Sequence, residues 1–464
     1  MPAGGTTLDR KTMVADGLTV AAASRALRER RVSAAALTEQ CLAAIAARSA
    51  ELNAFITITA DEARRQAQTA DLELESGIDR GPLHGIPISL KDLIDVQGVA
   101  TTAASHVRDG HVAAADATVT ARLRQAGAVL VGKTNLHEFA FGTTNEDSAY
   151  GPARHPLDPT RSPGGSSGGS AVSVATGMAL ASLGTDTGGS IRIPAAACGL
   201  VGLKPSIGEI PLDGVVPLSA SFDHVGPLCR SVEDAQLLYD VLRGGSSARV
   251  PESREARTIR VGIPRDYFLA LLDEEVAAAF ISTCTRLANA GVMMSDVRVQ
   301  HTDLIGAVYT HVSIPEAVAY HAATLERIPE RYTPNVRMRL EAGRFLLAED
   351  YVRARQGCRE LRLAVDAALT DCDVLLLPTL AIPAPPLGMS TVRIGDRDEP
   401  VRNVMLRLTN LFNITGHPAI AVPCGATRTG LPVSAQLVGH LDQTQALLAV
   451  ARALEPHVTP SPAR

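Results

Sequence analysis

Lysine is scarce in this 464-residue chain. Lysine and arginine number 44 together, and only four of them are lysines, at positions 11, 91, 133 and 204. An arginine keeps its proton near neutral pH, whereas a buried lysine can lose its proton and act as a base. Genome base composition alone can produce such a bias. Even so, the scarcity makes each lysine a candidate for a role that arginine cannot fill.

Paired-cysteine motifs, the His-Glu-x-x-His motif and long apolar runs are also absent. The seven cysteines are scattered, which favours reduced thiols in the cytoplasm over a disulfide framework or a zinc site. We therefore expect no metal ion and no cofactor. No apolar run approaches the length of a membrane span, and no signal peptide is evident. These absences predict a soluble, cytoplasmic protein.

The overall composition is that of an ordinary globular protein, with 46% hydrophobic and 20% charged residues. The length allows one large α/β domain or two to three smaller ones. A net charge of −5 gives no reason to expect binding to nucleic acid or to a membrane. The expected partner is a small-molecule substrate, and the sequence also allows for a homodimer.

Secondary-structure patterns divide the chain near residue 80. Before it, Thr19 and Ser33 are typical N-caps for helices over 20–31 and 34–47, and 61–75 continues in helical style. After it, short apolar runs alternate with helical stretches, which predicts an α/β sheet covered by helices on both faces. The expected strands are 86–90, 128–131, 374–377, 419–422 and 434–438, and the expected helices are 117–125, 231–242 and 274–290.

Two stretches are predicted to be irregular. Residues 243–257 are polar and rich in glycine and serine, as in a linker. Residues 381–402 are rich in proline, glycine and charged residues, which indicates a long loop and a candidate rim or lid of a pocket.

The segment from Gly184 to Arg192 reads Gly-Thr-Asp-Thr-Gly-Gly-Ser-Ile-Arg. Ser190 and the early Pro194 suit the start of a helix. Backbone N–H groups at such a start can point into one concavity and stabilise a developing oxyanion. The alternative is an anion-binding or structural turn. The candidate donors are the N–H groups of Thr187, Gly188, Gly189 and Ser190.

A glycine- and serine-rich segment that precedes it in the chain, residues 163–170, contains Ser166. It matches the Gly-x-Ser-x-Gly nucleophile elbow, which requires a strand directly before the serine. The preceding residues 158–163 are rich in turn formers and make a poor strand, so the elbow interpretation is the weaker one.

Lys91 follows an apolar, strand-like run. Burial there disfavours the charged amine, so the pKa of Lys91 falls and the residue can serve as a base. The alternative is a lysine at a strand end whose amine reaches solvent. No serine lies three residues before any lysine, so the Ser-x-x-Lys arrangement is unsupported.

These three segments closely resemble the amidase signature family. The likeness is strong over about 81–242, is loose over about 245–400, and resumes at 413–419 and at 430–437. The resemblance implies an α/β fold with a large, mixed and mostly parallel sheet covered by helices on both faces. It also implies one domain over 1–464, with a helical N-terminal part (1–80), a signature core (81–242), a variable pocket region (243–402) and a C-terminal part of the core (403–464).

What the resemblance implies for the site is a Ser–cis-Ser–Lys triad. Lys91 matches the family's base, Ser166 its cis serine and Ser190 its acylated nucleophile. Neutral Lys91 would take a proton from Ser190 through Ser166, and the same relay would protonate the leaving amine. The oxyanion would bind the N–H groups of Thr187, Gly188, Gly189 and Ser190. Asp186, Arg192 and Ser167 are the expected supporting residues, and Gly142 and Thr143 the expected substrate-facing ones.

Three functions are compatible with these residues. The first is a free-standing serine hydrolase of small amides, anilides and carbamates, like the aryl acylamidases and urethanases of the family. The second is the amidase (glutaminase) subunit of a tRNA-dependent amidotransferase, although segment 348–354 is more similar to the hydrolases. The third is a binding protein that has kept the fold, which the presence of all three triad residues disfavours.

Overall fold

The computed structural model describes residues 17–245 and 254–460, and within these residues eleven strands form one sheet. In sheet order the strands are β1 (Phe55–Ile58), β3 (Val129–Thr134), β2 (Pro87–Lys91), β4 (Ala181–Thr185), β6 (Val225–Cys229), β5 (Val201–Lys204), β12 (Ala419–Ala426), β13 (Pro432–Val438), β9 (Val374–Pro378), β7 (Arg260–Pro264) and β8 (Met293–Val297). The predicted α/β class and large mixed sheet are confirmed.

The parallel pairs lie at the two flanks of this sheet. Strand β2 pairs in parallel with β3 and β4, and β7 pairs in parallel with β8 and β9. The remaining six neighbouring pairs are antiparallel: β1–β3 at one edge, and the five pairs from β4 to β9 through the central part, which include the β12–β13 hairpin. The buried strands are rich in apolar residues, as expected where helices cover a sheet.

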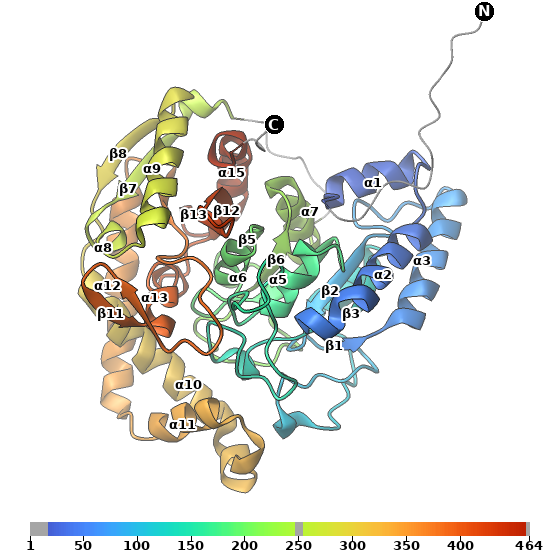
Figure 1. Ribbon diagram of the computed structural model, residues 1–464, viewed down its shortest axis with the longest axis horizontal. Coiled ribbons are helices and arrows are strands. Elements are labelled where there is room, and N and C mark those ends of the chain that lie inside the picture. Colours follow the sequence, from blue (N-terminus) through green and yellow to red (C-terminus); the bar gives the residue numbers. More distant parts are fainter. Residues whose placement is uncertain (1–16, 246–253, 461–464) are drawn as a thin grey trace, which may run out of the picture.

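Helices flank the sheet along its length (Figure 1). Helices α1–α3 lie at one end of the molecule beside β1–β3, whereas α9 and α12 lie at the other end beside β7–β9. The helices are α1 (Val20–Arg28), α2 (Ala34–Leu52), α3 (Ala60–Glu75), α4 (Thr118–Gln125), α5 (Gly168–Ala175), α6 (Arg192–Ala197), α7 (Val232–Leu242), α8 (Asp266–Leu269), α9 (Glu274–Asn289), α10 (Ile305–Arg327), α11 (Pro334–Gly343), α12 (Ala348–Leu369), α13 (Val401–Leu406), α14 (Leu411–Ile414) and α15 (Thr444–Val458).

The two predicted N-caps are confirmed. The hydroxyl of Thr19 accepts from the N–H of Ala22, and that of Ser33 accepts from Ala36. Helix α2 extends further than predicted, to Leu52, and ends where Asn53 adopts a left-handed conformation with φ 49°. None of the helices in the described part of the chain is long and apolar enough to cross a membrane.

The two stretches predicted to be irregular have different outcomes. The middle of the predicted linker, residues 246–253, lies outside the described residues. The predicted long loop 381–402 is instead partly regular, because β10 (Thr391–Ile394) and β11 (Arg397–Pro400) form an antiparallel hairpin. The strands are only four residues long and mostly exposed, and β11 contains no buried apolar residue, so the hairpin gives only a weak strand pattern.

Candidate active site

The candidate site begins where two parallel strands end. Lys91 is the last residue of β2 and Thr185 the last of β4, and the pairing of Leu90 with Leu183 places both ends at the same edge of the sheet. The Nζ of Lys91 donates to the hydroxyl of Thr185 at 2.7 Å. The carboxyl ends of parallel strands are common positions for ligand sites.

Lys91 is fully buried, so the alternative of an amine reaching solvent is wrong. Burial lowers the pKa of Lys91 to about 7, against the opposing negative charges of Asp186 and Asp223. The Nζ of Lys91 donates to the hydroxyl of Ser166 at 2.8 Å. A buried amine with a pKa near 7, hydrogen-bonded to a serine, is suited to exchange a proton with it.

Ser166 lies in the turn that leads into α5, and its peptide bond with Gly165 is cis. Residues 162–164, directly before it, form neither helix nor strand, which excludes the nucleophile elbow. The backbone of 143–145 packs tightly on Gly165, where a Cβ atom would lie 2.8 Å from the Asn145 nitrogen. The carbonyl of Ser166 accepts from the N–H of His137 at 3.1 Å.

Ser190 lies next to this turn, because its carbonyl accepts from the N–H of Ser167 at 3.2 Å. Only 5% of Ser190 is exposed. No described residue accepts a hydrogen bond from the four consecutive N–H groups at this position, those of Thr187, Gly188, Gly189 and Ser190. Helix α6 begins two residues later, at Arg192, and contains Pro194 in its first turn. Four adjacent donors without a protein acceptor are available to a developing oxyanion.

A buried ion pair fixes the chain on both sides of these donors. The guanidinium of Arg192 donates to both carboxylate oxygens of Asp186 at 3.1 Å, and both side chains are fully buried. The Asp186 carboxylate also accepts from the amide of Asn413 at 2.8 Å and from the backbone N–H groups of Ile191 at 3.2 Å and Arg192 at 3.4 Å. Although burial opposes it, Arg192 holds the pKa of the Asp186 carboxyl well below its usual range.

Asp223 and Thr409 form hydrogen bonds with the first two residues of the four-donor segment, Thr187 and Gly188. The hydroxyl of Thr187 donates to Asp223 at 2.6 Å, and the hydroxyl of Thr409 donates to the carbonyl of Gly188, also at 2.6 Å. Burial raises the pKa of Asp223 to about 6, against hydrogen bonds from Thr187 and two backbone N–H groups. Tyr309 lies against Gly188, where a Cβ atom would be 2.4 Å from its hydroxyl.

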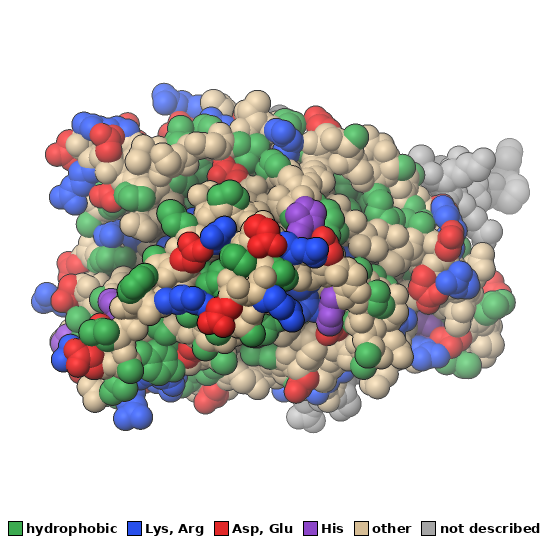
Figure 2. Space-filling view, turned by 90° about the horizontal axis from the view of Figure 1, so that it is seen from below, with side chains coloured by type: hydrophobic (Ala, Val, Ile, Leu, Met, Phe, Trp, Pro, Cys, Tyr) green, Lys and Arg blue, Asp and Glu red, His purple; other side chains and the backbone are tan. Residues whose placement is uncertain are grey.

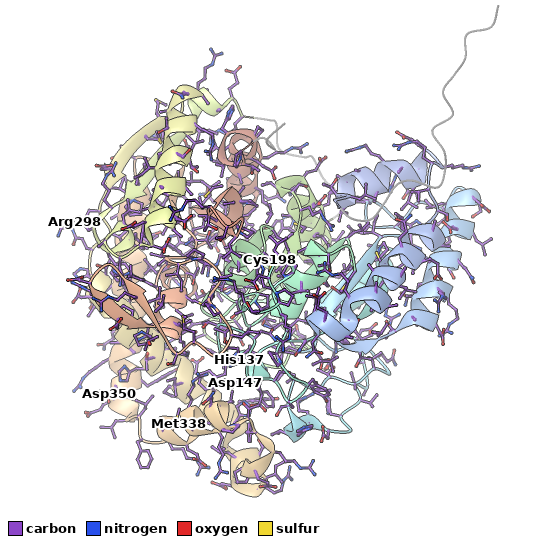
Figure 3. All side chains as sticks on the ribbon, in the orientation of Figure 1. His137, Asp147, Cys198, Arg298, Met338 and Asp350 are labelled. Carbon is purple, nitrogen blue, oxygen red and sulfur yellow. The ribbon has the colours of Figure 1, made fainter. Side chains whose placement is uncertain are left out.

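Ser167, predicted to support the site, and Thr143 and Gly142, predicted to face the substrate, lie near the turn that contains Ser166. Ser167 donates through its hydroxyl to the carbonyl of Thr185 at 3.2 Å, which joins the turn of Ser166 to the end of β4. Thr143 packs against Gly165 through its backbone. Gly142 lies flat against the ring of His137, which leaves no room for a side chain. Figure 3 labels His137 beside Asp147, and their ring nitrogen and carboxylate are 3.1 Å apart.

Sequence reasoning missed several residues that hold this site together. Asn413 and Gln436 both accept from Arg192, at 2.7 and 3.1 Å. A signal was present for these two, because each lies in a segment that carries the family resemblance. The contacts of Thr185, Asp223 and Thr409 were not predictable from the sequence, since they depend on how distant segments pack. Among the described residues, no group of three or more His, Cys, Asp or Glu side chains is placed to hold a metal.

Comparison with protein families places this site in a known group. A family model described as Amidase matches residues 36–448. This chain belongs to the amidase family. It is therefore an enzyme that acts on carbon–nitrogen bonds, as predicted.

Curated relatives and solved structures resemble this amidase over nearly its whole length. A glutamyl-tRNA(Gln) amidotransferase subunit of Koribacter versatilis is 36% identical, over 94% of this chain and 98% of the relative. The same subunit of Anaeromyxobacter dehalogenans is 39% identical, over 93% and 94%. A structure titled "Crystal structure of amidase" has a TM-score of 0.90 at 40% identity, over 95% and 100%. The corresponding amidotransferase subunit from Thermotoga maritima has a TM-score of 0.76 at 29% identity, over 98% and 99%.

Proposed function

We propose that this amidase hydrolyses the carboxamide of glutamine through an acyl-enzyme on Ser190, as the amidase subunit of a tRNA-dependent amidotransferase. The observation that carries the chemistry is the 2.8 Å hydrogen bond from Lys91 to Ser166, next to Ser190 and four unengaged N–H groups. The role within an amidotransferase is supported by the curated relatives, which match over 93–94% of this chain and carry the name of such a component.

The proposed reaction needs only groups of this chain and water. Neutral Lys91 accepts a proton from Ser166 as Ser166 takes the proton of Ser190, whose oxygen attacks the carboxamide carbon. The four N–H groups stabilise the resulting oxyanion. The relay then returns the proton to the leaving nitrogen, and ammonia departs. Water hydrolyses the acyl-enzyme by the same route and releases glutamate.

The test is the release of ammonia and glutamate from glutamine, measured for the purified chain alone and after addition of the partner subunits of an amidotransferase. We expect hydrolysis to appear or to increase with the partners, and to vanish in Ser190→Ala. Absence of ammonia in both mixtures, with the partners shown to be bound, would contradict the proposal.

This proposal changes one expectation about partners. The relatives' name includes a tRNA, so the expected absence of a nucleic-acid partner does not extend to the assembled complex. On the face shown in Figure 2, acidic and basic side chains are interspersed. This face therefore lacks the continuous positive patch that attracts a nucleic acid.

A second candidate is the free-standing hydrolase of small amides, anilides and carbamates, an aryl acylamidase or urethanase. It is favoured by the higher similarity to the structure titled as an amidase than to the Thermotoga protein, with TM-scores of 0.90 and 0.76. Aryl carbamates and 4-nitroanilides test it directly. Release of the aromatic amine by the chain alone, absent in Ser190→Ala, would favour this candidate, and no release from either substrate class would reject it.

A further inference from the structure

Arg402 differs from the other arginines whose Nε atom is buried without a hydrogen-bond partner in the described structure. Arg124 is ion-paired with Asp116 at 2.9 Å, and Arg407 donates to the carbonyl of Tyr267 at 2.8 Å and lies over its ring. No described residue forms an ion pair or a hydrogen bond with the Arg402 side chain. A buried N–H without any such partner is costly, because it has lost water without replacement, and this applies to the Nε of Arg402.

The position of Arg402 on α13 places it near the candidate site. Leu406, four residues later on the same face of the helix, packs on Gly188, where a Cβ atom would lie 2.9 Å from its Cδ2. Thr409, just beyond the helix, donates to the carbonyl of the same glycine. Arg402 is thus one helical turn from residues that touch the candidate oxyanion donors.

The surroundings of Arg402 join the two sides of the site. Burial raises the pKa of Tyr309, which lies against Gly188, and the positive charge of Arg402 opposes this rise. Burial lowers the pKa of His137, which lies against Gly142, and Arg402 adds to this decrease. Burial and the positive charge of Arg402 both lower the pKa of a second arginine, Arg339. Arg339 donates to the carbonyl of Phe141 at 2.7 Å. Arg339 likewise has no ion-pair partner within 4.0 Å among the described residues. The nearby carboxylate of Asp147 is engaged by His137 and Asn335.

From this geometry we infer that Arg402 binds a carboxylate on the acyl part of the substrate, so that the site selects amides of dicarboxylic acids over neutral amides of the same size. A guanidinium offers paired N–H donors that match a carboxylate. The inference rests on the proposed function, because the α-carboxylate of glutamine is such a group. It also separates that function from the second candidate, whose anilide and carbamate substrates are neutral.

The experiment compares 4-carbamoylbutanoate with pentanamide, two primary amides of similar length of which only the first is anionic. For the wild type, we expect kcat/KM to be at least about 10-fold higher for the anion. Arg402→Met should lower kcat/KM for the anion by about 10–100-fold, mainly through KM, and leave pentanamide within about 2-fold. Arg397→Met, a change of an exposed arginine on β11, is the matched control and should alter neither value.

A binding measurement separates failure of this inference from failure of the proposed function. Glutarate carries the carboxylate and lacks the carboxamide, so it should raise the Tm of the wild type and of Arg397→Met but not that of Arg402→Met. If this pattern holds while glutamine is not hydrolysed, Arg402 binds carboxylates and the glutaminase proposal fails. Equal losses for both amides in Arg402→Met, no preference of the wild type for the anion, or equal Tm shifts in all three proteins would each overturn the inference.

Discussion

The two glycine- and serine-containing segments, 163–170 and 184–192, both contain a Gly-Gly-Ser sequence but differ in their hydrogen bonding. In the first, the carbonyl and hydroxyl of Ser166 are both engaged, by His137 and Lys91. In the second, no described residue accepts from four consecutive N–H groups, while the buried Asp186–Arg192 pair holds the chain on either side. Glycine allows both close approaches. Contacts with other segments then decide whether the polar groups of a turn are hydrogen-bonded within the protein or remain available to a substrate.

Removal of each serine tests the different tasks of the two segments and should have the largest effect. Ser190→Ala should lower kcat for amide hydrolysis by about 10⁴–10⁶-fold, because it removes the attacking oxygen. Ser166→Ala should cost less, about 10²–10⁴-fold, because it interrupts only proton transfer. Steady-state ammonia release from one amide substrate compares the two variants. An equal or greater loss in Ser166→Ala would reverse the assignment of roles.

Loss of the Asp186–Arg192 ion pair, which flanks the segment of Ser190, should lower the stability of the folded protein. Arg192→Met leaves Asp186 buried without its cation, which should reduce the free energy of unfolding by about 3–5 kcal/mol. The exposed pair of Arg265 and Asp296 is the control, and Arg265→Met should cost less than about 1 kcal/mol. Urea unfolding measures both changes. Similar values for the two variants would show that the buried network does not hold the segment.

The pH dependence of kcat/KM tests the charges around Lys91. Because the neutral amine is the reactive form, activity should rise with pH through about 7, the pKa of Lys91. The Asp223 carboxylate raises this pKa, so Asp223→Asn should move the rise to lower pH. A rise that stays in place or moves to higher pH in Asp223→Asn would contradict this electrostatic account.

The smallest expected effect belongs to Thr409, whose hydroxyl donates to the carbonyl of Gly188. Thr409→Val keeps the volume and removes one hydrogen bond, which is worth about 1 kcal/mol, or about 5-fold in kcat/KM. The loss should appear with every amide substrate, because it acts on the oxyanion donors and not on recognition. Unchanged kinetics would show that Gly188 is fixed without this contact.

The parts of the fold that were predictable are those with a local signal. Residues 374–377 were predicted as a strand and form most of β9, because a short, continuous apolar run of this kind is typical of a buried strand. Strands β1, β4–β8, β10 and β11 were missed. The buried strands β4–β7 are short runs interrupted by glycine, which weakens a strand pattern, and β8, β10 and β11 are mostly exposed. In the site, Lys91, Ser166 and Ser190 carried a signal in their own segments. The contacts of Asp223 and Thr409 were not predictable, because their partners, Thr187 and Gly188, are 36 and 221 residues away.

The central claim is that the second segment carries the nucleophile and the first carries the relay. The most direct measurement is mass spectrometry of peptides after reaction of the folded protein with a fluorophosphonate, which phosphonylates an activated serine. We predict that the wild type is labelled on Ser190 alone, that Ser166→Ala is labelled there more slowly, and that Ser190→Ala is not labelled. Label on Ser166, or undiminished labelling of Ser190→Ala, would contradict this claim.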